Sequence, residues 1–394
     1  EHPKNRDLLF AGGEFGLYVS FDRGDHWQEW KNNLPRVPVD DIQIHPRDND
    51  LILATHGRSV WIVDSISSLE QMTPAVAEST LTAFDVRPAT MWRMARTRDF
   101  DGADTFLGAN PPRGAIIDFW VKAKPETKDV KISILDPAGK MVATVKPGSL
   151  DAGVNRVVWG MRTDRVVPPT RQEIQAAERA EAAGAPPPQF GGPYVDPGDY
   201  TVEIAVGANK ATKKFKVEED PRITWFSAAD RARRHTAIAE LVDLTKQVDG
   251  LRKKFTAADG ALTALQSSWK RPDATKVSDS VKSAASALKN KLDELRPLFA
   301  GRNFFQPPSP EERKEELAKP EPEFVLPNLA QRVGQLLNQL DGYAAAPSQS
   351  QFEQIALTKT AVANGAQGIE KLKAEVVKFN DAMNAAKVPY VPVP

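Results

Sequence analysis

The chain of 394 residues contains no cysteine. Disulfide bonds, thiolate metal ligands and cysteine nucleophiles are therefore excluded, although export from the cytoplasm is not, because exported proteins need not carry disulfides. Histidine is also scarce, with five residues. The metalloprotease, P-loop and nucleophile-elbow motifs are absent. The sequence therefore offers no ready-made catalytic or metal-binding motif, and we expect neither a metal nor any other cofactor.

An excess of charge of either sign is also missing. Lysine and arginine together number 52, aspartate and glutamate also number 52, and the pI is about 7.2. No overall field therefore attracts nucleic acid or an anionic membrane surface. No apolar run approaches the ~18 residues that a membrane-spanning helix needs. We expect no nucleic-acid partner and no membrane span, and the length suggests two to four domains.

The most informative stretch of the chain reads S-F-D-R-G-D-H-W, from Ser20 to Trp27. Before it, apolar residues alternate with Tyr18 and Ser20, as in a half-buried strand. Asp22 and Gly24 then supply turn chemistry, because an aspartate side chain can bond backbone amides two residues on and glycine tolerates positive φ. We expect Trp27 to fold back over the turn as an apolar cap. The stretch therefore predicts the tip of a β-hairpin.

The spacing S-x-D-x-G-x-x-W resembles the Asp box of bacterial-neuraminidase-type (BNR) repeats. In that family the box lies at the periphery of a β-propeller blade, so the resemblance implies a structural role. The box residues are Ser20, Asp22, Gly24 and Trp27.

Residues 7–66 as a whole resemble the last part of a sortilin-type, glycosyl-hydrolase-like propeller of bacterial secreted proteins. The matching words are L-F-A-G-G-E-F-G-L-Y, K-N-N-L-P, I-H-P-R-D-N-D and T-H-G-R-S-V-W-I-V-D. The resemblance implies incomplete propeller blades over residues 1–75 and a periplasmic or extracellular location. Within one blade we expect strands at 41–44, 51–55 and 60–63.

A propeller closes a ring of about 4–8 four-stranded blades, and closure removes the exposed sheet edges. Residues 1–75 account for barely one complete blade and the end of another. We therefore interpret the sequence as the C-terminal piece of a longer polypeptide. The remaining blades, from the same precursor or another chain, are the expected partner, and residues 7–66 should pair with their strands.

Three residues near predicted strand ends are candidates for ligand contact on the propeller face: Glu14, His56 and Arg58. A glycosidase needs two carboxyl groups that flank the scissile bond, and Glu14 and Asp64 are the likeliest acids here. Neither has a partnered base or nucleophile in the sequence pattern, and no arginine triad with a Tyr–Glu pair can be assembled. We therefore assign no catalytic residue and expect both acids to be structural.

Asp48, Asn49 and Asp50 have the spacing of calcium ligands. The glycine and the distal glutamate of an EF-hand loop do not follow them. A blade turn is the favoured interpretation.

Residues 76–220 predict an antiparallel β-sandwich, because short β-prone runs alternate with turn sequences. Three motifs resemble the Ig-like module of flagellar hook-capping proteins: D-x-x-G-K at 136–140, A-G-x-N-x-x-x-W at 152–159 and P-G-x-Y at 197–200. An insertion at 166–192 interrupts the pattern, and within it residues 171–183 predict a helix.

Residues 221–394 predict an antiparallel four-helix bundle, because apolar residues recur at three- and four-residue steps in four stretches. Ser227 is expected to cap the first helix, and Ser348 with Gln351 to form a capping box for the fourth. A proline-rich crossover at 301–327 separates the second and third. Leu288 and Leu292 should be buried against the first helix, and Phe379 against a neighbouring helix.

These patterns together predict a secreted or periplasmic binding or scaffold protein without catalytic activity. Further partners would be a second copy or another cell-envelope protein. Two alternatives stay open. One is a sialidase-like glycosyl hydrolase whose catalytic residues lie outside this chain. The other is an accessory subunit of a large envelope complex, suggested by the long helices and the proline-rich segments.

Overall fold

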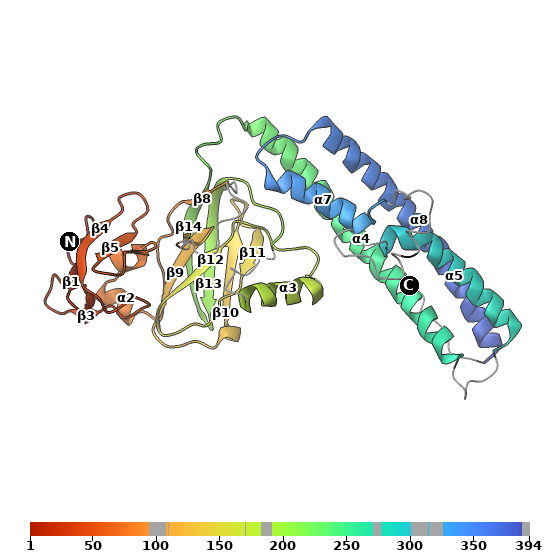
Figure 1. Cartoon of the computed structure of the whole chain (residues 1–394), viewed down its shortest axis with the longest axis horizontal. Coiled ribbons are helices and arrows are strands. Elements are labelled where there is room, and N and C mark those ends of the chain that lie inside the picture. Colours follow the sequence, from red (N-terminus) through yellow and green to blue (C-terminus); the bar gives the residue numbers. More distant parts are fainter. Residues whose placement is uncertain are drawn as a thin grey trace. The chain divides into compact units, whose positions relative to one another are not determined.

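The computed structural model of the chain contains several β-sheets and a set of long helices, so the predicted multidomain β-plus-α class is confirmed (Figure 1). The chain divides into two compact units, one of residues 1–164 and 186–223 and the other of residues 165–185 and 224–394. The residues that the structure describes are 1–93, 108, 110–169, 171–182, 191–270, 277–300, 314 and 326–387.

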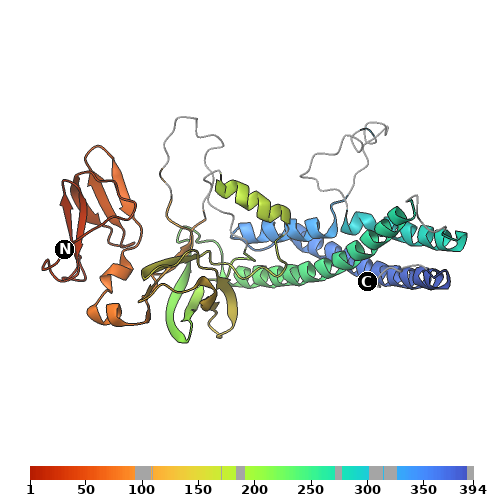
Figure 2. The same ribbon diagram turned by 90° about the horizontal axis from the view of Figure 1, so that it is seen from below.

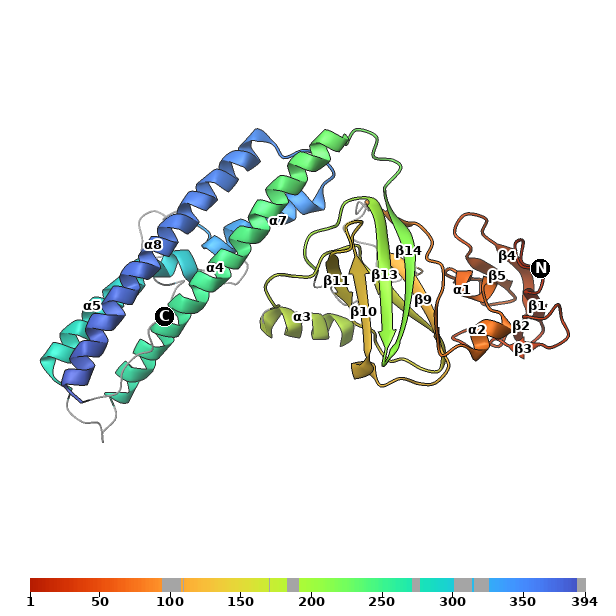
Figure 3. The same ribbon diagram turned by 180° about the vertical axis from the view of Figure 1, so that it is seen from behind.

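Two three-stranded antiparallel sheets form the first part of the chain (Figure 3). The first sheet has the order β1 (Leu9–Gly13), β2 (Gly16–Ser20) and β3 (Gln28–Glu29). The second has the order β4 (Val39–Ile44), β5 (Leu51–Thr55) and β6 (Val60–Val63). The strands predicted for this second sheet are confirmed.

One apolar core joins these two sheets. Leu17 from β2 and Leu51 and Leu53 from β5 are fully buried in it, together with Ile66. The sheets approach closely at Gly12, where an added Cβ would collide with the carbonyl oxygen of Val39. Within the described part of the chain, no further strand pairs with the outer edges of β4 and β6.

Two short helices, α1 (Ser67–Glu70) and α2 (Pro74–Glu78), lead into a second β region with two facing sheets. The smaller sheet has the order β12 (Gly153–Trp159), β9 (Ala115–Val121) and β7 (Leu81–Ala83). The larger has the order β11 (Met141–Val145), β10 (Val130–Leu135), β13 (Gly198–Val206), β14 (Asn209–Glu219) and β8 (Ala89–Met91). A 3₁₀ turn, Thr127–Asp129, precedes β10.

Strand pairing here is antiparallel except between β14 and β8, which run parallel. The strand pattern predicts antiparallel pairing throughout. β8 and β14 lie far apart in the sequence, with β9 to β13 between them, so no hairpin joins the two strands and the long connection permits parallel pairing.

The core between these sheets is aromatic at one end. The ring of Trp159 lies 5.4 Å from that of Tyr200 and 5.9 Å from that of Phe215. The Tyr200 hydroxyl donates a 2.8 Å hydrogen bond to the carbonyl of Asp196, four residues upstream. Burial raises the pKa of Tyr200 to about 12, so the hydroxyl stays protonated and remains a donor.

The helices begin where the sequence predicts them. The predicted insertion helix is confirmed as α3 (Arg171–Ala182). The long helices are α4 (Ala228–Ser268), α5 (Asp279–Phe299), α7 (Leu329–Gly342) and α8 (Gln349–Ala385). Ser227 caps α4, and Ser348 and Gln351 form the predicted capping box of α8. Residues 183–190 of the predicted insertion and almost all of the 301–327 crossover lie outside the described residues.

The two longest helices run in the same direction. Near the start of α4, Glu240 forms a 2.6 Å ion pair with Lys359 of α8. After the end of α4, the ring of Trp269 lies 6.5 Å from that of Phe379, farther along α8. α4 and α8 are therefore parallel.

α5 and α7 run opposite to this pair and lie end to end (Figure 2). Phe299 at the end of α5 and Leu329 at the start of α7 both lie against Gly365, near the middle of α8. An added Cβ at Gly365 would lie 3.1 Å from the Phe299 ring and 3.3 Å from Leu329. The two shorter helices therefore share one side of the α4–α8 pair.

This arrangement differs from the predicted antiparallel four-helix bundle. α4 and α8 have 41 and 37 residues, whereas α5 and α7 have 21 and 14. Two short helices placed in tandem cover about the length of one long helix, at ~1.5 Å per residue, so three helices pack side by side along most of the length. Leu288, Leu292 and Phe379 are fully buried in the common core, as predicted.

Candidate functional site

The Asp-box stretch forms a compact turn between β2 and β3. The Ser20 hydroxyl accepts a 2.8 Å hydrogen bond from the Gly24 amide and donates one of 2.8 Å to Asp22. Asp22 Oδ1 also accepts the amide of His26 at 2.9 Å. Arg23 and Gly24 have φ values of 62° and 97°, so the left-handed turn needs the glycine that the motif places there.

Two features of this turn differ from the sequence expectation. Ser20 was expected on the solvent-facing side of its strand, but it is buried, because its hydroxyl satisfies turn amides. Asp22 reaches an amide four residues ahead instead of two. Trp27 lies against the turn, since an added Cβ at Gly24 would be 3.5 Å from its ring, and its side chain remains exposed.

Asp22 also forms a 2.6 Å ion pair with the imidazole Nδ1 of His26. Hydrogen bonds from the His26 amide and side chain lower the pKa of Asp22 to about 2. The same side-chain bond raises the pKa of His26 above its usual 6.5. These hydrogen bonds run between residues of the turn itself, so their arrangement holds the hairpin.

The three predicted ligand contacts lie at two hairpin tips. Glu14 is exposed in the two-residue turn between β1 and β2, and His56 and Arg58 are exposed in the turn between β5 and β6. Both tips flank the start of β4. Gly12, shortly before the first tip, approaches Val39 at the start of β4. Thr55, directly before the second tip, pairs with the same Val39.

His56 is held at this place by two contacts. Its amide donates a 3.0 Å hydrogen bond to the carbonyl of Pro38, and its ring Nδ1 lies 3.6 Å from Asp40. The structure thus brings Glu14 and the His56–Arg58 turn to the same end of the two sheets.

A cleft of about 320 Å³ opens at this end. Phe15, next to Glu14, forms one side, and Trp30, Pro35 and Arg36 contribute to the rest. None of these residues is among the predicted ligand contacts. An exposed phenylalanine beside glycine in a hairpin tip was the signal that could have pointed to them.

Asp64 follows β6 and is half-buried. Burial, followed by the nearby charge of Asp50, raises the pKa of its carboxyl group. The Asp64 carbonyl accepts a 2.6 Å hydrogen bond from Arg156 of β12. Glu14, the other predicted acid, is exposed at its hairpin tip.

Asp48, Asn49 and Asp50 lie in the turn between β4 and β5, and other protein groups bond to the side chains of all three. Asp48 pairs with Arg47 at 2.6 Å, and the Arg47 hydrogen bond lowers the pKa of Asp48. Asn49 donates a 2.9 Å hydrogen bond to Glu70, and Asp50 accepts one of 2.7 Å from the Ser65 amide. Among the described residues, no group of three or more histidine or acidic side chains could hold a metal ion.

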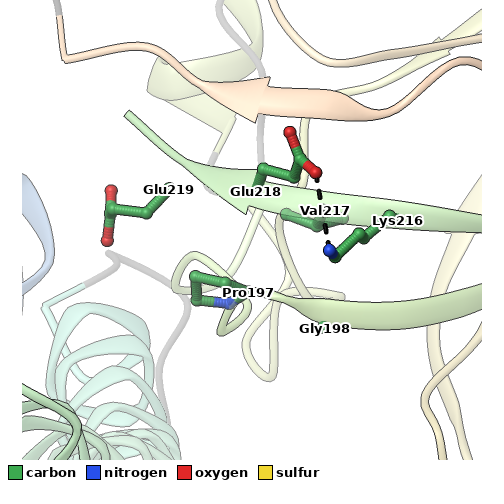
Figure 4. Close-up of a pocket in the computed structure, with 6 residues that line it drawn as sticks. All are labelled: Pro197, Gly198, Lys216, Val217, Glu218 and Glu219. Carbon is green, nitrogen blue, oxygen red and sulfur yellow. Dashed lines mark ion pairs between the residues drawn. The ribbon is translucent and has the colours of Figure 1, made fainter. Parts of the chain in front are cut away.

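A second, shallow concavity of about 440 Å³ lies beside β14 (Figure 4). Lys216 and Glu218 pair at 3.6 Å along its wall. Glu219 at the end of the strand lies 3.7 Å from Arg93. The charged groups of this pocket are thus paired with other protein groups.

No protein-family model matches the sequence, and a search of the curated proteins finds no match. In the described part of the chain, every helix is too short or too polar to traverse a lipid bilayer.

Proposed function

We propose that this chain is part of a non-catalytic binding and scaffold protein of the Asp-box propeller type, located in the bacterial periplasm or outside the cell. Its first two sheets would be propeller blades, and the sheets of residues 76–220 an Ig-like sandwich. The location follows from the family resemblance alone.

The observation that carries this proposal is the Asp-box turn. Ser20, Asp22 and Gly24 form a closed set of hydrogen bonds across the hairpin tip. The turn connects β2 to β3 of the first sheet. This sheet packs on the second sheet through Leu17 and Leu53. Successive antiparallel sheets packed in this way are the building principle of a propeller.

A second support is the free face of the β4–β6 sheet. Leu51 and Leu53 point into the shared core, so Ile52 and Ala54 lie on the opposite face. Ile62 pairs with Ile52, and Val60 pairs with Ala54. Ile62 and Val60 are 57% and 58% exposed. This face is apolar along β5 and β6 and polar along β4, where the exposed residues Asp41 and Gln43 pair with Ala54 and Ile52. An exposed apolar strip of this kind is suited to another sheet, so we propose that further blades cover it.

The Ig-like assignment is supported by Tyr200. Its hydroxyl bonds back to the Asp196 carbonyl at the start of β13, which is the arrangement of the tyrosine corner in Ig-like sandwiches. In the 136–140 motif, the Asp136 side chain accepts the amides of Ala138 and Lys140 at 2.9 Å. The motif therefore serves as a tight hairpin turn before β11.

A scaffold role fits the charged residues described above. Around the Asp box, the β4–β5 turn and β14, charged side chains are paired with each other or with backbone groups. The helices add a long apolar core lined by leucine, valine and phenylalanine. Such helices can present a surface to a second copy or another envelope protein.

A glycosyl hydrolase is the second candidate, favoured by one observation. Asp64 is a half-buried carboxyl group with a raised pKa, as a general acid requires. Burial and the charge of Asp50, against the opposing charge of Arg156, also explain the raised pKa as a feature of the packed seam between β6 and β12. Any further catalytic groups would then lie outside this chain.

Two assays test the proposal. Aryl-glycosides and sialosides should give no turnover with the chain, and turnover that Asp64→Asn abolishes would promote the hydrolase instead. For location, the chain lacks cysteine, so Leu357→Cys on exposed α8 surface creates a single label site. A maleimide that cannot cross the inner membrane should label it in cells with a permeabilised outer membrane. Labelling only after complete lysis would contradict an extracytoplasmic location.

A further inference from the structure

His2 is a buried histidine that the proposed function does not use, and its side chain has no contact with solvent. It belongs to the segment 1–8, which precedes β1. Its ring meets the β4–β5 turn at Asn49, with the His2 Nε2 and the Asn49 Oδ1 3.1 Å apart. The Glu70 carboxylate of α1 lies 3.9 Å from the same ring nitrogen. One imidazole therefore joins residues 1–8 to the turn and to α1.

The hydrogen bonds around the ring determine which nitrogen carries the proton. Nδ1 accepts the backbone amides of Lys4 and Asn5 at 3.2 and 3.3 Å, so this nitrogen is bare. The Asn49 side-chain nitrogen donates to a Glu70 oxygen at 2.9 Å, so the Asn49 Oδ1 is the atom that faces His2. An oxygen acceptor there requires that Nε2 carry the hydrogen. His2 is therefore the neutral Nε2–H tautomer, and both ring nitrogens have partners.

A charge on this ring is incompatible with the bonds at Nδ1. A proton taken from solvent onto Nδ1 turns the acceptor of two amides into a donor, because both nitrogens of a charged imidazole donate. The Lys4 and Asn5 amides would then face a third N–H group and no acceptor. Leaving a donor without a partner costs more than a made hydrogen bond contributes. The turn of residues 2–5 therefore has to open, so that these amides reach water.

The charges that face His2 keep the ring itself in place. Glu70 attracts a charged imidazole across 3.9 Å, and it also lies 4.0 Å from the Lys4 ammonium. The other charged groups nearby pair with one another, both on the segment (Glu1 with Arg6, Asp7 with Arg23) and in or beside the turn (His45, Arg47, Asp48, Asp50 and Arg87). A charge on His2 therefore opens the turn of residues 2–5 and leaves the ring beside α1.

We propose that His2 is a proton switch, in which a charge on the ring releases the Lys4 and Asn5 amides and opens the turn of residues 2–5 ahead of β1. The turn is closed while His2 is neutral and open when His2 is charged. The switch goes beyond the proposed function and does not depend on it, because it requires only the contacts of segment 1–8 with the β4–β5 turn and α1.

NMR of the full 394-residue chain, labelled with nitrogen-15 in the histidine rings, tests the starting state. At about pH 7.5, where histidine is ordinarily uncharged, His2 should carry its proton on Nε2 and none on Nδ1. Amide hydrogen exchange, corrected for the intrinsic rate at each pH, should then be followed down to about pH 5, the range in which histidine changes charge. Protection of the Lys4 and Asn5 amides should fall about fivefold to tenfold, the effect of losing one hydrogen bond, as the His2 ring titrates.

His2→Asn is the matched variant, because an asparagine oxygen accepts nearby backbone amides and does not titrate. It should keep both amides protected at every pH. His56→Asn changes an exposed histidine at a hairpin tip and should leave the pH response as in the unmodified chain. If His2→Asn loses protection at every pH, the coincidence of ring charging and amide exposure in the unmodified chain decides.

Four results would overturn the switch. The first is a proton on Nδ1 of His2 in the neutral ring, and the second is a ring that becomes charged while both amides stay protected. The third is a ring that remains uncharged down to about pH 5. The fourth is an unchanged pH response of the Lys4 and Asn5 amides in His2→Asn.

Discussion

Arg156 of β12 and Asp118 of β9 form a two-point ion pair, with nitrogen–oxygen distances of 2.8 and 2.9 Å. Asp118 is buried, and the remaining donors of Arg156 bond the carbonyls of Asp64 and Ser65, both at 2.6 Å. The pair thus ties the end of the β4–β6 sheet to the second β region. Asp118 keeps the pKa of Arg156 raised against the opposing effect of burial.

Replacement of Arg156 by methionine should destabilise this unit. The change leaves Asp118 buried without its cation and frees two carbonyl groups. The cost should be about 2–3 kcal/mol, below the ~3–5 kcal/mol of a fully buried pair because part of Arg156 meets solvent. Urea denaturation measures it. Lys122→Met, which breaks an exposed pair with Glu78, should cost under ~1 kcal/mol, and an equal cost for the two would contradict the role of Arg156.

Leu292→Ala should destabilise the helical unit by ~2–5 kcal/mol, because it opens a cavity in a packed core. Leu292 is fully buried in α5. Leu357→Ala on the exposed surface of α8 is the control and should leave the thermal midpoint almost unchanged. An unchanged midpoint for Leu292→Ala would refute the packing of α5 described above.

Two helix glycines should respond in opposite ways to alanine. An added Cβ at Gly250 of α4 meets nothing within 4 Å, so Gly250→Ala should stabilise by about 0.5–1 kcal/mol through helix propensity. Gly365→Ala would crowd Phe299 and Leu329, and overpacking costs about 1–3 kcal/mol. We expect no stabilisation there. Thermal unfolding distinguishes the two, and a gain at Gly365 would argue against the end-to-end contact of α5 and α7.

The Asp-box pair should titrate measurably. Because the pKa of His26 is raised, its bond to Asp22 stabilises the fold fully below pH 6.5 and less as pH rises through the folded pKa. Because the pKa of Asp22 is lowered to about 2, its contribution is present above about pH 4 and lost toward pH 2. NMR titration of His26 should give a pKa above 6.5 that falls in Asp22→Asn. An identical value in both proteins would contradict the pair.

Local signals predicted much of the fold. Ser227 and Ser348 cap helices where their sequence patterns predict, and β5 matches its expected residues. These features depend on residues a few positions apart, so local sequence patterns are enough to predict them. The buried leucines of α5 follow from helical periodicity in the same way.

Contacts between residues far apart in the sequence could not be predicted from local patterns. Periodicity shows that a helix has an apolar face, but not that α5 and α7 share one side of α8 through Gly365. Strand patterns do not reveal the parallel pairing of β8 or the bonds from Arg156 to Asp64. The cleft at Phe15 combines a hairpin with the 29–36 segment, and only the fold brings them together.

We propose that another sheet covers the exposed face of β4–β6. Because the chain lacks cysteine, Ile62→Cys places one thiol on that face, and Leu357→Cys places one on exposed helix surface. The rate of maleimide labelling should be measured for each in the isolated chain and in the native protein from its host. We predict fast labelling of both in the isolated chain, and strong protection of Ile62→Cys alone in the native protein. Equal labelling of Ile62→Cys in both preparations would contradict the account.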